Sequence, residues 1–384
     1  MLVPDFLQNV AERAVELWEQ LNIYAIRDIA RRIKDAENHM TATAEWQEYK
    51  LRQGGLCRDE IMKEVRRLLP ASDEEVRRIF EEAIITSNDN DADVFRAAGV
   101  EPQPFNTRAA QDTMQAIMEQ TNGTLRNLTG TTAGEGQKAY FDACDRAVMK
   151  VRSGVVSQSQ AIREAIVEAA EGGLRVYYPK TGWTDTVEVA VRRAITTGAN
   201  QVALRATIDN CERMGTNYVI VSSHLGARVS DTNPIANHYG WQGQVYRIAK
   251  RERGFWGRLS AFFDMLQGKR EYPLLREATG YPDDPLGLGG YNCRHSMYPY
   301  IPNVSKNHME QYDSEENRKR YELSQKQRAK ERDIRKDRRI KAGLEAAGED
   351  AVEVAKRLRR KINDYNAFCR ENRLTPQMDR TFIA

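Results

Sequence analysis

The spacing of apolar residues predicts a helical N-terminal part of the chain. Between residues 5 and 35, apolar side chains recur every three or four positions, which is the period of one face of an α-helix. A second stripe covers residues 56–69 and is predicted to end at the proline that follows, because the residue before a proline avoids helical geometry. Ser72 and Glu75 have the spacing of a capping box and predict the start of a third helix.

Residues 1–104 are therefore predicted to form a helical N-terminal domain. Residues 89–93 alternate carboxylates as a calcium loop does, but the loop positions that need glycine and glutamate are valines, so a solvated turn or a helix start is predicted. Residues 101–104 and 123–136 are predicted linkers because of their proline, glycine and threonine content. Helical periodicity then returns, and residues 105–173 are predicted to be a helical connecting region.

Short runs of β-branched and aromatic residues predict a small β-sheet in the centre of the chain. The strongest signal is Tyr-Val-Ile-Val at residues 218–221, which leads directly to His224. Residues 174–304 are therefore predicted to form a central α+β domain. Its other predicted elements are strands at 174–178 and 241–248, a helix at 185–214, an apolar helix or insertion at 251–272 and an extended segment at 298–302.

The last part of the chain, residues 305–384, is charged and is predicted to be a helical tail. Residues 315–341 contain twelve Lys or Arg against six Asp or Glu, with few large apolar side chains, which predicts a solvated basic helix. An amphipathic helix with apolar positions between residues 351 and 368 is predicted to follow. The predicted fold class is α+β, with a helical N-terminal region, a central mixed domain with a small β-sheet and this tail.

Composition indicates a soluble, folded protein. The 384 residues exceed the usual size of a single core, and 41% of them are apolar and 29% charged. The five cysteines lack paired spacing, so no disulfide framework is expected and folding in a reducing cytoplasm is predicted. No window approaches the ~20 apolar residues of a membrane span, so no membrane partner is expected. The net charge of +3 is too small to indicate nucleic-acid binding by itself.

Two short loops, residues 222–243 and 289–295, concentrate the groups that can bind a metal, transfer a proton or hold an anion. Three imidazoles and one thiol make zinc an alternative, although their spacing matches no compact zinc module. The preferred interpretation is structural, with the polar side chains bonding backbone carbonyls and carboxylates and so connecting the loops. The candidate binding residues are His224, Arg228, His238, Trp241, Gln242, Asn292, Cys293, Arg294 and His295, and the zinc candidates among them are His224, His238, Cys293 and His295.

The arginines and the tryptophan of these loops also have a structural explanation. Arg228 and Arg294 can each bind a phosphate, but pairing with an acidic residue is expected. The acidic candidates are Asp231, Asp283 and Asp284. Trp241 is expected in the core with its indole N–H bonded.

Two other functions compete with a structural one. A metal- or cysteine-dependent hydrolase or nucleotidyl-modifying enzyme would use Cys293 with the histidines, but no orienting residue and no known catalytic motif accompanies them, so no catalytic residue or cofactor is assigned. A nucleic-acid-binding scaffold would contact phosphates through the basic helix. The candidate residues for that contact are Lys330, Arg332, Arg335, Lys336, Arg338 and Arg339.

The same loops carry a family resemblance. The segments SSHLGAR, HYGWQGQVY and GYNCRHSMYPYIP, which begin at residues 222, 238 and 290, resemble tailed-phage minor capsid proteins of the minor capsid protein 2 type. That type is related to the head-morphogenesis protein F of phage Mu. AVRRAITTGANQ and NRLTPQMDRT, which begin at residues 190 and 372, extend the resemblance. The family's signature falls here on His224, Gly226, Ala227, Arg228, His238, Trp241, Gln242, Gly243, Asn292, Cys293, Arg294 and His295.

The resemblance implies a structural virion component of the phage head, made in the host cytoplasm and present in several copies near the portal. Portal and capsid proteins are the implied partners, and contact with packaged double-stranded DNA is expected through the basic tail. Relatives often have a lysine where this chain has Gln244, which weakens any argument for a basic group at that position.

Overall fold

The computed structural model describes residues 10–40, 44–102, 107–248 and 272–381. All of the predicted apolar segment at 251–272 except its last residue lies outside this part. The chain groups into two compact units, and each combines stretches that are distant in the sequence. The sheet unit comprises residues 1–10, 77–120 and 195–324, and the helical unit comprises residues 11–76, 121–194 and 325–384. The division into four consecutive domains stays a prediction.

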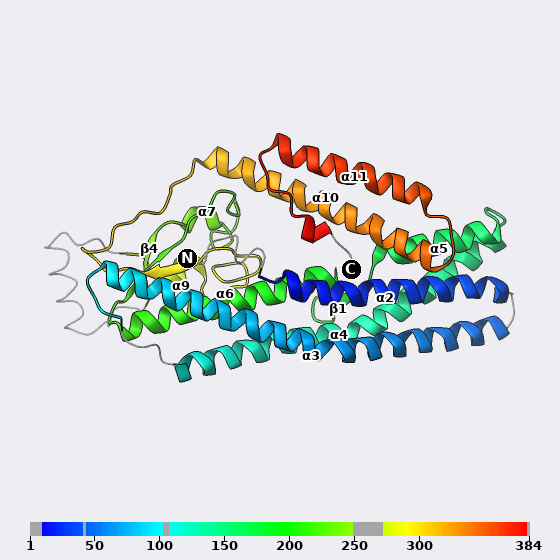
Figure 1. Ribbon diagram of the computed structural model, residues 1–384, viewed down its shortest axis with the longest axis horizontal. Helices are drawn as coiled ribbons and strands as arrows, with labels where there is room; N and C mark the ends of the chain where they lie inside the picture. The colour runs from blue at the N-terminus through cyan, green and yellow to red at the C-terminus, as the bar shows by residue number, and fades with distance from the viewer. Residues whose placement is uncertain (1–9, 41–43, 103–106, 249–271, 382–384) are drawn as a thin grey trace. The chain divides into compact units, whose positions relative to one another are not determined.

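The first predicted helix is confirmed as α2 (Glu12–Asp35), which buries one apolar face within the helical unit. α2 packs along α5 (Gln158–Gly172). It also lies beside the first part of α3 (Ala44–Ala97), where the indole N–H of Trp18 donates to the Ser72 hydroxyl at 3.1 Å (Figure 1). Trp18 is 1% exposed. The apolar periodicity of this segment therefore reports a packed helix face.

Helix α3 is continuous where the sequence predicted an end and a new start. Pro70 lies inside α3, and Ser72 is buried against Trp18 rather than capping a helix. Leu68 and Val76 are both buried, so packing on either side of the proline offsets its cost, which is about 3 kcal/mol in a helix interior. The prediction of two helices was wrong because local rules do not include this tertiary burial.

Two more predicted breaks are helical. The predicted linker at 123–136 lies within α4 (Thr107–Arg152), where Gly136 allows close contact with α3, because a Cβ there would meet the Ile61 side chain at 2.4 Å. The acidic run at 89–93 lies within α3, and Asp91 is 1% exposed instead of solvated. Residues 98–102 lie outside the helix, as predicted for residues 101 and 102, and the rest of the predicted linker at 101–104 lies outside the described residues.

The next elements agree with the prediction except for β2, which the sequence did not predict. β1 (Arg175–Tyr178) pairs antiparallel with β2 (Trp183–Thr186), and α6 (Val187–Arg213) follows, with its residues from Ile195 onward belonging to the sheet unit. The tail contains α10 (Ser314–Ala346) and α11 (Val352–Glu371), whose contact includes a hydrogen bond from the Tyr365 hydroxyl to Glu331 at 3.0 Å. The helical unit also contains two short 3₁₀ helices, Ala36–His39 and Met378–Thr381. No described helix combines the length and apolar character needed to cross a bilayer.

Helix α10 is not solvated all round, which corrects the sequence prediction. Ile334, Ile340 and Leu344 are buried, and so are Arg335 and Arg339. This segment contains few large apolar residues, but Ile334, Ile340 and Leu344 lie on one side of the helix and are enough to pack it. Most of the exposed charged residues of α10 precede Ile334, and they include Arg318, Lys319, Lys326 and Arg332.

The sheet unit contains a three-stranded antiparallel sheet with β3 (Tyr218–Val221) between β4 (Val245–Arg247) and β5 (Met297–Pro299). Ile220 pairs with Val245 on one side and with Tyr298 on the other. β4 is shorter than predicted, because residues 238–241 form the single turn α7 (His238–Trp241). A second short helix, α9 (Leu275–Thr279), precedes the loop that leads to β5. The predicted α+β class is thus confirmed.

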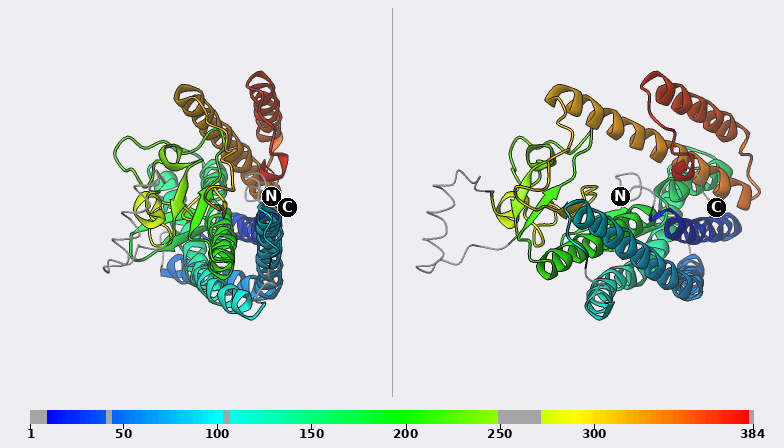
Figure 2. Two further views of the ribbon diagram at one scale, coloured as in Figure 1. Left: turned by 90° about the vertical axis from the view of Figure 1, so that its left-hand side faces the viewer. Right: turned by 60° about the vertical axis from the view of Figure 1, so that its left-hand side comes forward.

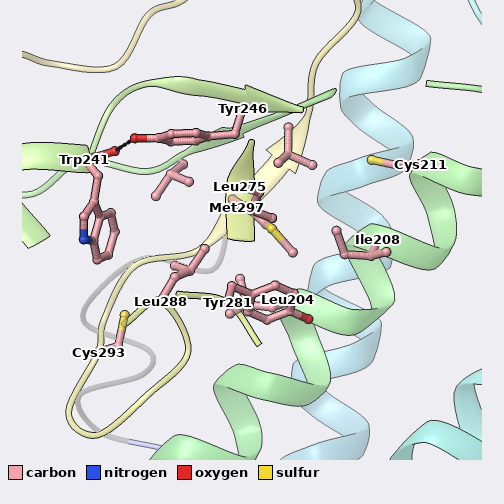
Figure 3. Packing of buried hydrophobic residues seen from close by; sticks show 12 residues of the cluster. Leu204, Ile208, Cys211, Trp241, Tyr246, Leu275, Tyr281, Leu288, Cys293 and Met297 are labelled. Atoms are coloured by element: carbon pink, nitrogen blue, oxygen red, sulfur yellow. Dashed lines mark hydrogen bonds between the residues drawn. The ribbon is translucent and has the colours of Figure 1, made fainter. Parts of the chain in front are cut away.

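The core of the sheet unit lies between this sheet and the second part of α6 (Figures 1 and 2). Leu204, Ile208 and Cys211 of α6 pack against the strands. Figure 3 shows Trp241 and Cys293 at one end of the same cluster, with the Tyr246 hydroxyl donating to the Trp241 carbonyl at 2.7 Å. The loops that carry the candidate residues are therefore continuous with the core.

Candidate functional site

The sheet topology brings the two candidate loops together. β3 is antiparallel to both neighbours, so the residues after its end lie beside those that precede β4 and β5. The Ser222 amide donates to the Ser296 carbonyl at 2.8 Å, and the Gly243 amide donates to the Val221 carbonyl at 3.1 Å. Segments more than fifty residues apart in sequence thus meet at one sheet edge.

The histidines of these loops form one aromatic cluster with Trp241. The His295 ring stacks on His224 with centroids 4.4 Å apart, and it meets Trp241 edge-on at 4.8 Å. His238 packs against the same Trp241 ring at 4.5 Å. His295 is fully buried, at 0% exposure, and is the central ring of the cluster.

Polar contacts fix the orientation of these rings. The Gln242 side-chain oxygen accepts from the His224 amide at 3.0 Å and also lies 3.0 Å from Nε2 of His295. Nδ1 of His295 lies 3.7 Å from Sγ of Cys293. Nε2 of His238 lies 2.8 Å from the Leu286 carbonyl oxygen. Potential ligand atoms of His238, Cys293 and His295 all lie within 4.8 Å of one another, and His224 is not part of that set.

Burial keeps the cluster uncharged near neutral pH. Burial, with the charge of Arg294 as a second cause, lowers the pKa of His224 to about 3. Burial also lowers the pKa of His238 to about 4 and that of His295 well below its usual range. The pKa of the Cys293 thiol is raised by burial, against opposing hydrogen bonds and the two nearby arginines. The imidazoles are therefore neutral and the thiol keeps its proton.

These properties do not suit a Cys–His nucleophile. A catalytic thiol needs a lowered pKa and access to substrate, whereas Cys293 has a raised pKa and is 1% exposed. Its histidine neighbour is equally inaccessible. The structural interpretation of these loops fits this geometry, and a set of buried sulfur and nitrogen atoms could also hold a metal.

The comparisons with known proteins agree with the resemblance. The model of the family "Phage minor capsid protein 2" matches residues 2–370. The chain belongs to this family. It is 25% identical over 376 residues to a "Structural protein" of Lactococcus phage LL-H, and the match covers 93% of each chain. A "Structural protein" of Lactococcus phage mv4 is 35% identical over 117 residues, which are 30% of this chain and 94% of that protein. No solved structure matches the chain.

Membership defines the protein at a coarse level. It is a phage structural protein of the minor capsid type, and such a protein is a virion component whose partners are capsid-related. A structural family supports a non-enzymatic role, in agreement with the inaccessible thiol.

Residues that carry the resemblance make structural contacts. Trp241 is 4% exposed and its indole N–H donates to the Ile235 carbonyl at 2.9 Å, as expected. Arg228 connects the two loops, because its guanidinium donates to the backbone carbonyl oxygen of Tyr291 at 2.7 Å. Of the acidic residues considered as partners for Arg228 and Arg294, Asp231 bonds Arg318 instead.

Asn292 and Arg294, the other two candidates in the second loop, contribute a backbone conformation and a positive charge, respectively. Asn292 has φ 57 and an exposed side chain, so its place in the signature reflects a left-handed turn rather than a contact. Arg294 is half-buried and adds positive charge beside His224 and His295. Asp283, the other acid considered for the arginines, pairs with Arg276.

The six basic candidates on α10 differ widely in access to a ligand. Arg335 and Arg339 are each 5% exposed and lie beside the buried carboxylate of Glu188. Such burial leaves them unsuited to contact DNA in this conformation. Lys336 pairs with Glu171, Lys330 lies over the Phe368 ring, Arg338 is half-buried and Arg332 is exposed.

Sequence reasoning missed two buried asparagines that hold the loops in place. Asn200 of α6 donates to the Cys293 carbonyl at 3.2 Å, and it stands in the upstream segment that carries the family resemblance. Asn317 accepts from the amides of Gly226 and Ala227 at 2.8 and 2.9 Å. Gly226 has φ +83, and a Cβ there would meet Arg320 at 3.0 Å. Asn317 stands among charged residues, where nothing in the sequence distinguishes it.

Replacing Asn317 by alanine is expected to lower the free energy of unfolding by about 2 kcal/mol, because two buried amides lose their acceptor. Lys319, an exposed residue on the same helix, provides the matched control, and its alanine variant should change stability by less than about 0.5 kcal/mol. Urea unfolding measures both values. Equal stability of the two variants would contradict the role given to Asn317.

Proposed function

We propose that this protein is a minor component of the phage head located at the portal vertex, made in the host cytoplasm and present in several copies. The observation that carries the proposal is the family match over residues 2–370. A shell built by repeated symmetry uses many copies of one subunit, so a component present in few copies belongs at a place where that symmetry is broken. The portal vertex of a tailed phage head is such a place.

Cross-linking of purified particles, followed by mass spectrometry, tests the position. Links between this chain and the portal protein are expected, together with links to shell subunits next to the portal. Links to shell subunits alone, with none to the portal in particles whose portal is itself efficiently cross-linked, would overturn the proposal.

We also propose that the tail contacts packaged DNA, through a set of cations different from the one that the sequence suggested. In the described part of the helical unit, exposed cations without an acidic partner are found on both tail helices. They are Lys326 and Arg332 of α10 and Arg359, Arg360 and Arg370 of α11. Exposed guanidinium and ammonium groups release counterions when they neutralise phosphates, which requires no base-reading motif.

Replacing Arg359 and Arg360 together by glutamine is expected to weaken duplex DNA binding and to lower the slope of log affinity against log salt by about 2. The matched control is Lys341→Gln on α10, because Lys341 is already paired with Glu345. Fluorescence anisotropy at several salt concentrations measures the slope. Absence of binding by the wild type at low salt, or an unchanged slope in the double variant, would refute DNA contact by these residues.

A further inference from the structure

We propose that His238, Cys293 and His295 form a zinc site that joins the two signature loops at the sheet edge. His238 begins α7, and the other two residues precede β5, so one ion would bridge segments that share no strand. The three side chains are 2%, 1% and 0% exposed. Trp241 and Cys293 lie at the same end of the apolar cluster (Figure 3), which encloses the site on that side.

The distances suit a tetrahedral ion. Zinc binds sulfur at about 2.3 Å and imidazole nitrogen at about 2.0–2.1 Å, so a tetrahedral centre places these two ligand atoms about 3.6 Å apart. Sγ of Cys293 and Nδ1 of His295 are 3.7 Å apart. All three ligand atoms lie within 4.8 Å of one another, so small side-chain movements would complete the geometry.

The hydrogen bonds leave one nitrogen of each of the two histidine rings unprotonated. The Gln242 group that accepts from the His224 amide is the amide oxygen, so Nε2 of His295 must donate its proton to that oxygen. Nδ1 of His295 is then unprotonated and faces Sγ of Cys293. Nε2 of His238 likewise donates to the Leu286 carbonyl, which leaves its other ring nitrogen unprotonated. Metal-binding histidines commonly donate their second ring N–H to a protein oxygen in this way.

The donor set indicates the metal. One thiolate and two imidazoles favour zinc among the divalent ions available in cells, and the set contains no carboxylate of the kind that magnesium or calcium prefers. The three side chains leave one position of a tetrahedral centre, which a water molecule can take. Because the residues are enclosed, the ion would have a structural role in fixing the loops, and this role is compatible with a capsid protein.

The competing explanation without a metal is a hydrogen bond from the Cys293 thiol to Nδ1 of His295. Zinc content of the full chain, purified from zinc-supplemented cells and dialysed, separates the two. We expect ~1 zinc per chain in the wild type, retention in Cys211→Ala and loss in Cys293→Ala. Cys211 is the matched control because it is a buried cysteine of the same core. A wild type without zinc, or a Cys293→Ala variant that keeps it, would overturn the proposal.

Two measurements on the wild type keep the test decisive if the Cys293 variant fails to fold. Cobalt in place of zinc should give the intense visible bands of a four-coordinate ion together with a thiolate charge-transfer band. Removal of zinc with a chelator should lower the melting temperature by roughly 5 °C or more, and added zinc should restore it. Cobalt binding without a thiolate band, or melting that ignores the chelator, would refute the site.

Discussion

Replacing Glu188 by alanine is expected to destabilise the protein by about 3–5 kcal/mol, because it leaves two buried guanidinium groups without their carboxylate. Glu188 is 2% exposed and lies 3.6 Å from Arg335 and 3.5 Å from Arg339. Neither pair is a close hydrogen bond, and one oxygen of Glu188 has no hydrogen-bond partner. The effect therefore comes from uncompensated buried charge more than from lost hydrogen bonds.

The environment of Glu188 determines which part of this range is expected. Glu19 is the next buried carboxyl, and burial followed by the charge of Glu188 raises its pKa to about 7. In the Glu188 variant that charge is gone while Arg335 and Arg339 still lower the pKa of Glu19, so a Glu19 carboxylate offsets part of the two guanidinium charges and the lower end of the range is expected. Arg335 also lines a cavity of about 420 Å³ in the helical unit, so a water molecule can reach part of the group.

Urea unfolding of Glu188→Ala and of a matched control measures the effect. Glu345→Ala is the control, because Glu345 pairs with Lys341 on the surface and its loss should cost less than about 1 kcal/mol. A Glu188 variant as stable as the control would show that other groups compensate the positive charges of Arg335 and Arg339.

Asp91 should make the stability of the protein depend on pH. Burial raises the pKa of this carboxyl from 3.8 to about 7, although Asn210 and Thr207 donate hydrogen bonds to it. Between these two pKa values the native state holds a proton that the unfolded chain releases, so stability falls as pH rises. Asp91→Asn keeps a neutral side chain at all pH values. The stability of the wild type relative to Asp91→Asn should thus fall by roughly 3 kcal/mol between about pH 5 and pH 8.

The comparison with the variant isolates Asp91 from Glu19 and the histidines, which also titrate. Asp89→Asn is the matched control, because Asp89 is an exposed carboxylate two residues earlier on the same helix. Its difference from the wild type should stay constant across the same pH range. A constant difference for Asp91→Asn as well would mean that Asp91 is charged in the folded protein.

Local sequence patterns predicted the elements whose buried residues recur at the regular spacing of a helix or a strand. β3 followed by His224 was predicted from four consecutive β-branched or aromatic residues, and α2 from its apolar stripe. Pro70 and Ser72 predicted a break that is absent, because the packing of Trp18 against the helix outweighs the local preference. Rules that consider neighbouring residues alone cannot include such a contact.

The candidate site, too, was predicted only in part. The sequence identified the residue types, and a small sheet was enough to predict that one loop follows β3. The sequence did not predict that His238, Cys293 and His295 lie together, with His224 stacked on His295 outside that set. This arrangement depends on the register of the strands and on the position of α7. Nor did it predict that Arg335 and Arg339 are buried, since their partner Glu188 lies on α6.

The most direct test of the proposed location is the copy number of this chain in purified phage particles, measured by quantitative mass spectrometry against the major shell protein. The account predicts a low and reproducible number, on the order of a dozen copies or fewer, as expected for a component on a closed ring at one vertex. A number that scales with the shell subunits, or absence from the particle, would contradict it.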